Sequence, residues 1–218
     1  MKLQLVVANK NYSSWSMRPW VLLREARIPF EEIPLKFDDE AHIPGVERYS
    51  PSGQVPVLLV DGDPVWDSLA ICETIAELFP ENHLWPGDIR ARRCARSICA
   101  EMHAGFRAVR SSMPMNVRAS HPGKGMSPAV QKDIERVVAI WQDCRARFAG
   151  EGSMLFGAFG VADAMFAPVV MRFGTYAVAL PPVAQAYADA TQGLTAVREW
   201  TAAARREAEF VPADEPYA

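Results

Sequence analysis

The sequence predicts an α/β domain of about 80 residues followed by an all-helical domain, and three observations support this prediction. Strand-like and helix-like periods alternate through the first 80 residues. A proline- and glycine-containing break then interrupts the pattern around Pro86-Gly87. Beyond the break, apolar residues recur at three- and four-residue steps, and no convincing strand follows. We therefore divide the chain into residues 1–80, a linker at 81–88 and residues 89–218.

The first domain is predicted to contain a small mixed sheet with helices. A helical segment joins two strand-like segments near its start, and such a β-α-β unit implies parallel strands. A turn signal, Asp61-Gly62-Asp63-Pro64, then predicts a hairpin, and a further helix closes the domain. The expected elements are strand Lys2–Ala8, helix Trp15–Arg27, strand Phe30–Phe37, strand Val57–Val60, return strand Val65-Trp66 and a helix from Ser68.

The second domain is predicted to be helical throughout. Its third helix is apolar nearly all round, so we expect that helix to be central and buried. The expected elements are helices Arg90–Met113, Pro128–Phe148, Val161–Phe173, Pro182–Ala190 and Thr195–Glu207, and an extended tail, Pro212–Ala218.

Composition and charge exclude several classes of function. The formal net charge is -3, and basic residues are spread along the chain, which argues against nucleic-acid binding. The N-terminal apolar run is too short for a membrane span and has no cleavage site of a signal peptide after it. The four cysteines show no CxxC spacing, so we expect reduced thiols and a cytoplasmic protein. The four histidines lie far apart, which predicts no metal site.

The segment Asn11 to Pro19 carries three serine hydroxyls at the start of a helix. A helix N-terminus offers free N–H groups and a partial positive charge, so an anion is stabilised there and a thiol ionises more easily. Ser13 and Ser14 are therefore candidates to stabilise a bound thiolate. By spacing alone, helix capping is the more frequent role of such serines.

Two further pairs could hold the rest of a peptide-like ligand. A cis bond before Pro56 would leave the N–H and C=O of Val55 free for such a ligand. Asp67 and Ser68 stand where a helix begins, and there they could bind an ammonium and a carboxylate, or simply cap the helix. A fourth segment, Gly160 to Asp163, fits a capping arrangement in which Asp163 bonds back to the helix start.

Together these four segments resemble the cytosolic glutathione S-transferase superfamily over nearly the whole chain. Ser13-Ser14-Trp15-Ser16 resembles the Ser-Ser-Cys-Ser motif of the zeta class, and Val55-Pro56 resembles the cis-proline of the superfamily. Asp67-Ser68 is similar to its Glu/Gln-Ser pair, and Gly160 to Asp163 to its capping box. The resemblance implies a thioredoxin-like domain followed by an all-α domain, usually as a homodimer.

The resemblance also implies roles for particular residues. Ser13, or else Ser14, would hydrogen-bond the thiolate of glutathione, a co-substrate; Val55 would pair with its cysteinyl backbone; and Asp67 and Ser68 would hold its γ-glutamyl end. A hydrophobic electrophile would bind between the domains. Candidate residues of that acceptor site are Tyr12, Met102, Phe106, Arg110, Met113 and Asn116, with Arg110 able to steer an acidic substrate or the glycyl carboxylate.

Three positions depart from the family pattern. Trp15 replaces the zeta cysteine and argues against a protein thiol as nucleophile, Asp67 is shorter than Glu or Gln, and Gly160 removes half of the capping box. The predicted function is transfer of glutathione to an electrophile. The alternatives are isomerisation of the maleylacetoacetate type and a non-catalytic binding or regulatory protein of the same fold.

Overall fold

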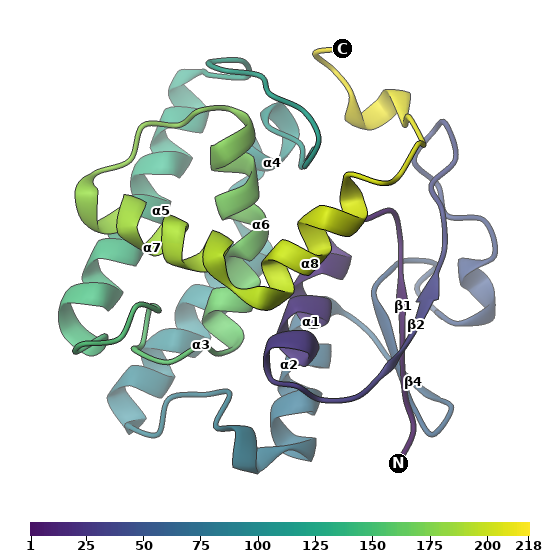
Figure 1. Ribbon diagram of the computed structural model, residues 1–218, viewed down its shortest axis with the longest axis horizontal. Helices are drawn as coiled ribbons and strands as arrows, with labels where there is room; N and C mark the ends of the chain where they lie inside the picture. The colour runs from purple at the N-terminus through teal and green to yellow at the C-terminus, as the bar shows by residue number, and fades with distance from the viewer.

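The computed structural model describes all residues, 1–218, and it separates a small sheet from a larger group of helices (Figure 1). Four strands form the sheet in the order β2-β1-β3-β4. Strand β1 (Leu3–Val7) runs parallel to β2 (Glu31–Pro34) and antiparallel to β3 (Val57–Val60), which pairs with β4 (Asp63–Val65). Helix α1 (Ser14–Glu25) connects β1 to β2, and α2 (Ser68–Leu78) follows β4. The first domain is thus thioredoxin-like, as expected.

The hairpin turn is shorter than predicted, and its second strand begins earlier in the chain. Strand β4 begins at Asp63, so the turn is confined to Asp61 and Gly62, whose φ angles are 51° and 99°. Pro64 therefore lies inside the strand. It is tolerated there because β4 is an edge strand, where no neighbour needs its missing N–H.

Every regular element beyond the break is helical. Helices α3 (Ile89–Ala104), α4 (Arg107–Ser112), α5 (Pro128–Phe148), α6 (Val161–Thr175), α7 (Pro182–Gly193) and α8 (Thr195–Ala204) follow in order. Short 3₁₀ turns lie at Val46–Arg48, Pro80–Asn82 and Pro212–Asp214. The last of these corrects the prediction of an extended tail. No helix is both long enough and apolar enough to span a lipid bilayer.

The predicted long helix from Arg90 to Met113 is wrong, because the chain breaks at Gly105 and Phe106. Phe106 adopts a left-handed conformation with φ of 58°, and a Cβ at Gly105 would lie 2.8 Å from the carbonyl oxygen of Glu101. The break frees the last carbonyls of α3. Arg110, one turn into α4, folds back and donates to the carbonyl oxygens of Met102 and His103.

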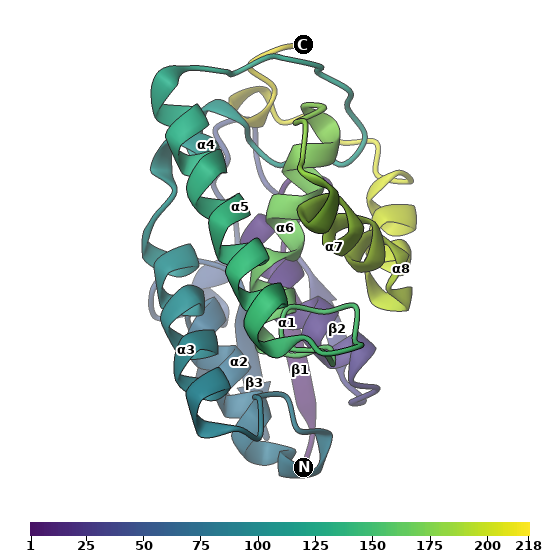
Figure 2. The same cartoon turned by 90° about the vertical axis from the view of Figure 1, so that its left-hand side faces the viewer.

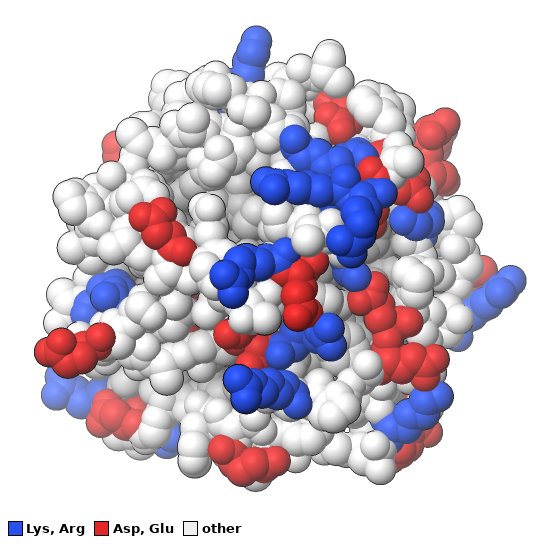
Figure 3. Space-filling model, in the orientation of Figure 1, with Lys and Arg blue, Asp and Glu red and all other residues white.

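Helix α6 forms the centre of the molecule, as its apolar sequence predicts. Nearly all of its residues are buried, and it contacts α1, α3 and α7. Helix α1 lies between the sheet and α6, so the first and last thirds of the chain pack side by side (Figures 1 and 2). This packing brings the loop after β1 close to α4 and α6. On the face shown in Figure 3, basic side chains gather near the C-terminal end of α8, with acidic ones beside them.

Candidate functional site

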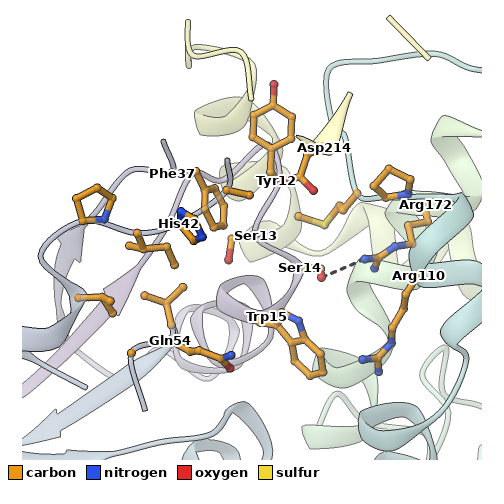
Figure 4. Close-up of a pocket in the computed structure, with 18 residues that line it drawn as sticks. Tyr12, Ser13, Ser14, Trp15, Phe37, His42, Gln54, Arg110, Arg172 and Asp214 are labelled. Atoms are coloured by element: carbon orange, nitrogen blue, oxygen red, sulfur yellow. Dashed lines mark hydrogen bonds between the residues drawn. The ribbon is translucent and has the colours of Figure 1, made fainter. Parts of the chain in front are cut away.

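A cavity of about 650 Å³ opens where the loop after β1 meets the helical domain. One wall comes from α1 and the residues just before it, a second from the segment between Phe37 and Val55, and a third from α4 and α6 (Figure 4). The lining residues used below are Tyr12, Ser13, Ser14, Trp15, His42, Gln54, Val55, Arg110, Arg172 and Asp214.

The two serines of the predicted site differ in their hydrogen bonds. Ser13 is the N-cap of α1: its hydroxyl accepts from the N–H of Ser16 at 3.3 Å and donates to Ser16 Oγ at 2.8 Å. The Ser14 hydroxyl accepts from Nη2 of Arg172 at 3.1 Å and has no acceptor within the chain (Figure 4). Ser13 is thus occupied in capping, whereas Ser14 keeps a proton that it can donate into the cavity.

A second cavity, of about 300 Å³, adjoins the first and shares Trp15, Gln54 and Val55 with it. Pro56, Asp67, Ser68 and His103 complete its walls together with Ser52 and Trp66. The peptide bonds Val55–Pro56 and Trp66–Asp67 are both cis. Neither the N–H nor the C=O of Val55 is hydrogen-bonded within the chain. The structure therefore brings Val55, Pro56, Asp67 and Ser68 together around one recess.

Asp67 and Ser68 stand at the N-terminus of α2. The Asp67 carboxylate accepts from the N–H of Leu69 at 2.8 Å and is in close hydrogen-bonding contact with Nε2 of His103 on α3. Ser68 is buried, and its hydroxyl accepts from Nη1 of Arg18 at 3.3 Å. Ser68 therefore resembles Ser14: each hydroxyl accepts from a buried arginine and keeps its own proton for the recess.

The arginines behind these hydroxyls have no carboxylate partner. Arg18, Arg110 and Arg172 form none of the ion pairs of the molecule, and Nε of Arg18 is buried without any hydrogen-bond partner. Burial, reinforced by the charges of the other two arginines, lowers the pKa of Arg18 to about 9. Burial and the charge of Arg110 lower the pKa of Arg172 to about 10. All the same, both guanidinium groups stay protonated at neutral pH, so the site is electropositive.

Trp15 holds two of these arginines. The guanidinium carbons of Arg18 and Arg110 lie 4.2 Å and 4.5 Å from the centre of its ring, and the His103 ring meets it edge-on at 5.5 Å. Cation–π contacts of this kind contribute about 0.5 to 2 kcal/mol each. The residue that replaces cysteine in the family motif thus fixes cations at the border of the two cavities.

Tyr12 connects the cavity to the C-terminal tail. Its hydroxyl donates to Glu215 at 2.7 Å and accepts from Nη2 of Arg118 at 2.8 Å. Arg118 also donates to the carbonyl oxygens of Glu207 and Glu209. These bonds hold the tail across the cavity, so Asp214 contributes to its lining.

Four residues predicted for the acceptor site do not line the cavity. Met102, Phe106 and Met113 are buried among the helices and belong to the hydrophobic core. Asn116 is also buried, and its side chain accepts from Asn11 Nδ2 at 2.9 Å. Met102 lies on the buried side of α3 itself, whereas Phe106, Met113 and Asn116 are buried in the segment that follows the end of α3 at Ala104. Tyr12 and Arg110 are the predicted acceptor residues that do reach the cavity.

The capping arrangement at α6 explains one departure from the family pattern. The buried Asp163 carboxylate accepts from the N–H groups of Gly160 and Leu155, each at 3.0 Å. A Cβ on Gly160 would lie 2.5 Å from the carbonyl oxygen of Leu84, which accepts from the N–H of Val161 at 3.0 Å. Glycine is therefore required by the close approach of another backbone segment.

Sequence reasoning missed Arg18, Arg172 and His103 as residues of the site, together with Gln54 and Asp214. Arg172 lies in an almost wholly buried helix, and a charged residue in such a helix is unusual enough to be a usable signal. Outside the two cavities, one ligand atom from each of Cys94, Asp143 and Cys144 lies within 4.8 Å of the others. All four cysteines are free thiols in the structure.

The fold and the site define a class of protein: a thioredoxin-like domain with a cis-proline and a serine at the start of α1, joined to an all-helical domain. Comparison with known proteins supports this class. Residues 12–78 match the model of the glutathione S-transferase N-terminal domain. The N-terminal third of the chain is thus similar to the N-terminal domain of glutathione S-transferases.

Curated relatives match the N-terminal part of the chain. Protein LigF of a Sphingobium strain is 40% identical over 78 residues, which are 34% of this chain and 30% of that protein. A probable maleylacetoacetate isomerase 2 of Drosophila melanogaster is 30% identical over 101 residues, covering 45% of this chain and 44% of that protein. The chain thus spans less than half the length of these relatives.

Solved structures match the whole fold. A glutathione transferase homologue from Burkholderia with bound glutathione superimposes with a TM-score of 0.72 at 22% identity, over 95% of this chain and 100% of that one. A Tau class glutathione S-transferase from mango gives a TM-score of 0.69 at 17% identity, over 94% and 96% of the two chains. These matches show a shared fold.

Proposed function

We propose that the protein is a glutathione S-transferase in which Ser14, backed by Arg172, stabilises the thiolate of glutathione. The observation that carries this proposal is the hydrogen bond from Arg172 to Ser14, because it leaves the serine proton free to point into the cavity. The partial positive charge at the start of α1 acts in the same direction. The family and the Burkholderia homologue with bound glutathione support glutathione as the co-substrate.

The two cavities suggest how the tripeptide lies. Ser68 and Asp67 would hold its γ-glutamyl carboxylate and ammonium, and the free N–H and C=O of Val55 would pair with its cysteinyl backbone. The sulfur would then meet Ser14 where the two cavities join. Binding energy from both ends of the tripeptide thereby fixes the sulfur for attack.

The chemistry proposed is conjugation. The bound thiol loses its proton to solvent, and its sulfur forms a bond to an electrophilic carbon of the acceptor while the leaving group departs with its electron pair. The hydroxyl of Ser14 lowers the thiol pKa because it hydrogen-bonds the charged form. With an acceptor that has no leaving group, the sulfur would instead add to one carbon of an activated double bond, and the neighbouring carbon would take up a proton from solvent.

Isomerisation is a second candidate, favoured by the likeness to the Drosophila maleylacetoacetate isomerase 2. In that reaction the thiolate adds to a double bond and leaves again after rotation. We further propose the division into residues 1–80, 81–88 and 89–218, a homodimer, a cytoplasmic location and a role in detoxification. The division rests on the break in the sequence pattern around Pro86-Gly87 and the location on the cysteine pattern, whereas the homodimer and the role in detoxification rest on the family resemblance.

Calorimetric titration with reduced glutathione tests the proposal. We expect binding that weakens for Ser68→Ala and for a glutathione lacking its γ-glutamyl residue. A panel of aryl halides, maleyl-type substrates and peroxides then separates transfer from isomerisation. Absence of both heat and thermal stabilisation at millimolar glutathione would favour a non-catalytic protein and contradict the proposal.

A further inference from the structure

The wall of the large cavity formed by α4 and α6 carries two arginines, Arg110 and Arg172, that form no ion pair, although Asp133 and Asp214 act on them from a greater distance. Arg110 donates to the carbonyl oxygens of Met102 and His103. Arg172 donates to the carbonyl oxygen of Met113 and to the hydroxyl oxygen of Ser14. A third arginine, Arg18, lies against the same Trp15 ring as Arg110. Asp214 is the one acidic residue of the cavity lining. Buried cations are normally paired, so this excess of positive charge indicates an anionic ligand.

Glutathione itself has a glycyl carboxylate, and the layout of the two cavities places it elsewhere. If the γ-glutamyl end lies at Ser68 and the cysteinyl backbone at Val55, the glycyl residue continues along the wall that carries Gln54 and His42. Figure 4 shows this wall on the side of the cavity opposite Arg110 and Arg172, with Ser13 and Ser14 between the two walls. The arginine wall therefore faces the acceptor.

We propose that the acceptor of this transferase is a carboxylate-bearing electrophile, and that Arg110 and Arg172 hold its carboxylate. This inference rests on the function proposed above. A planar guanidinium recognises a carboxylate by two parallel hydrogen bonds, and it does so most strongly where water is excluded. Trp15 and the carbonyl oxygens at the end of α3 hold Arg110 in place before the acceptor arrives, which reduces the entropy lost on binding.

Arg172 would then serve both reactants. One of its terminal nitrogens donates to Ser14, while Nε donates to the carbonyl oxygen of Met113. Its positive charge would favour the thiolate through Ser14 and the carboxylate of the acceptor directly. Arg110 has no contact with Ser14, so substitution of Arg110 separates acceptor recognition from thiolate stabilisation.

A matched pair of acceptors tests the proposal: 4-chloro-3-nitrobenzoate and its methyl ester. In both, sulfur forms the new bond to the ring carbon and chloride leaves with its electron pair. The ester is intrinsically more reactive, so each kcat/KM is divided by the uncatalysed second-order rate constant with glutathione at the same pH. We expect a normalised preference for the acid of at least 10-fold. One hydrogen bond between charged groups typically changes an equilibrium or rate constant about 10-fold or more.

The variant Arg110→Gln is expected to lower this preference at least 10-fold, and Arg110→Lys is expected to retain part of it. The matched control is Arg107→Gln, which removes an exposed arginine from the same helix outside the cavity and should keep the preference unchanged. Thermal unfolding and the affinity for glutathione are measured for each variant. Equal losses on both acceptors together with weaker glutathione binding would mean that Arg110 holds the glycyl carboxylate, and would overturn the proposal.

A binding measurement on the unmodified protein does not depend on turnover. The two conjugates, S-(4-carboxy-2-nitrophenyl)glutathione and its methyl ester, are compared by calorimetry. Tighter binding of the carboxylate, weakening as salt is added, supports the proposal. Equal binding of the two conjugates refutes it while leaving glutathione transfer intact. If neither conjugate nor glutathione binds, the proposed function itself is wrong and this inference falls with it.

Discussion

Replacing Ser14 by alanine should raise the pH at which glutathione transfer begins. The Ser14 hydroxyl is the one that lines the cavity with an uncommitted proton, because it accepts from Arg172 at 3.1 Å. Ser14→Ala removes the donor that would bond the thiolate. The protonated thiol gains little from that donor, so the substitution acts mainly on the charged form and raises the thiol pKa.

The size of the effect follows from the strength of one hydrogen bond to a charged group. Such bonds contribute about 1.5 to 3 kcal/mol. One pKa unit corresponds to about 1.4 kcal/mol, so the bound thiol should titrate about 1 to 2 units higher. Below both midpoints, kcat/KM should fall about 10- to 100-fold. Well above them, the rates of the two proteins should converge, because the thiol is then ionised in both.

The assay is the pH dependence of kcat/KM with a neutral aryl halide, supported by titration of the thiolate absorbance in the binary complex. Ser14→Thr keeps the hydroxyl and should restore the midpoint. Ser13→Ala provides a contrast, since Ser13 caps α1 and its loss should lower stability by about 1 kcal/mol without moving the midpoint. A shifted midpoint for Ser13→Ala and an unchanged one for Ser14→Ala would refute the reasoning.

Three further predictions concern Asp163, Gly160 and Asp67. Burial raises the pKa of Asp163 to about 6. The folded state then binds this proton more tightly than the unfolded state, so the contribution of Asp163 to stability falls as the pH rises from about 4 to 6. In urea titrations the advantage of the native protein over Asp163→Asn should shrink by about 3 kcal/mol over that range, and a constant difference would contradict this. Gly160→Ala should destabilise by at least about 1 kcal/mol in the same assay, because its Cβ would meet the Leu84 carbonyl oxygen at 2.5 Å; an unchanged midpoint would show that the backbone yields. Asp67→Asn should weaken glutathione about 10-fold by calorimetry, because it removes the charge that would pair with the γ-glutamyl ammonium, whereas unaltered affinity would exclude that role.

Much of the fold could be predicted from local patterns. The spacing of apolar residues predicted the strands of the sheet and the buried helix α6. An element that is buried on one face or on all sides carries apolar residues at a spacing that can be read from the sequence. The break at Gly105 and Phe106 left no comparable trace, since Phe106 is an apolar residue at an acceptable helical spacing. That break changed the positions of Phe106 and Met113, because the prediction places both on the axis of one continuous helix.

The sequence by itself predicted a set of groups for the tripeptide, Val55, Pro56, Asp67 and Ser68, because these residues lie in short motifs whose chemistry depends on neighbours in the chain. It also predicted a serine at the start of α1, but it left Ser13 and Ser14 equivalent. Only the tertiary structure separates them, because the deciding partner, Arg172, lies 158 residues away from Ser14 in the chain and reaches it through the packing of α6 against α1. The positive charge of the cavity wall formed by α4 and α6 has the same origin, because α4, α6 and Trp15 must fold together before Arg110 and Arg172 line one cavity. Local sequence sets the backbone conformation of each motif and the hydrogen-bonding groups that it offers. The electrostatic potential of the site instead arises from contacts between segments that are distant in the chain.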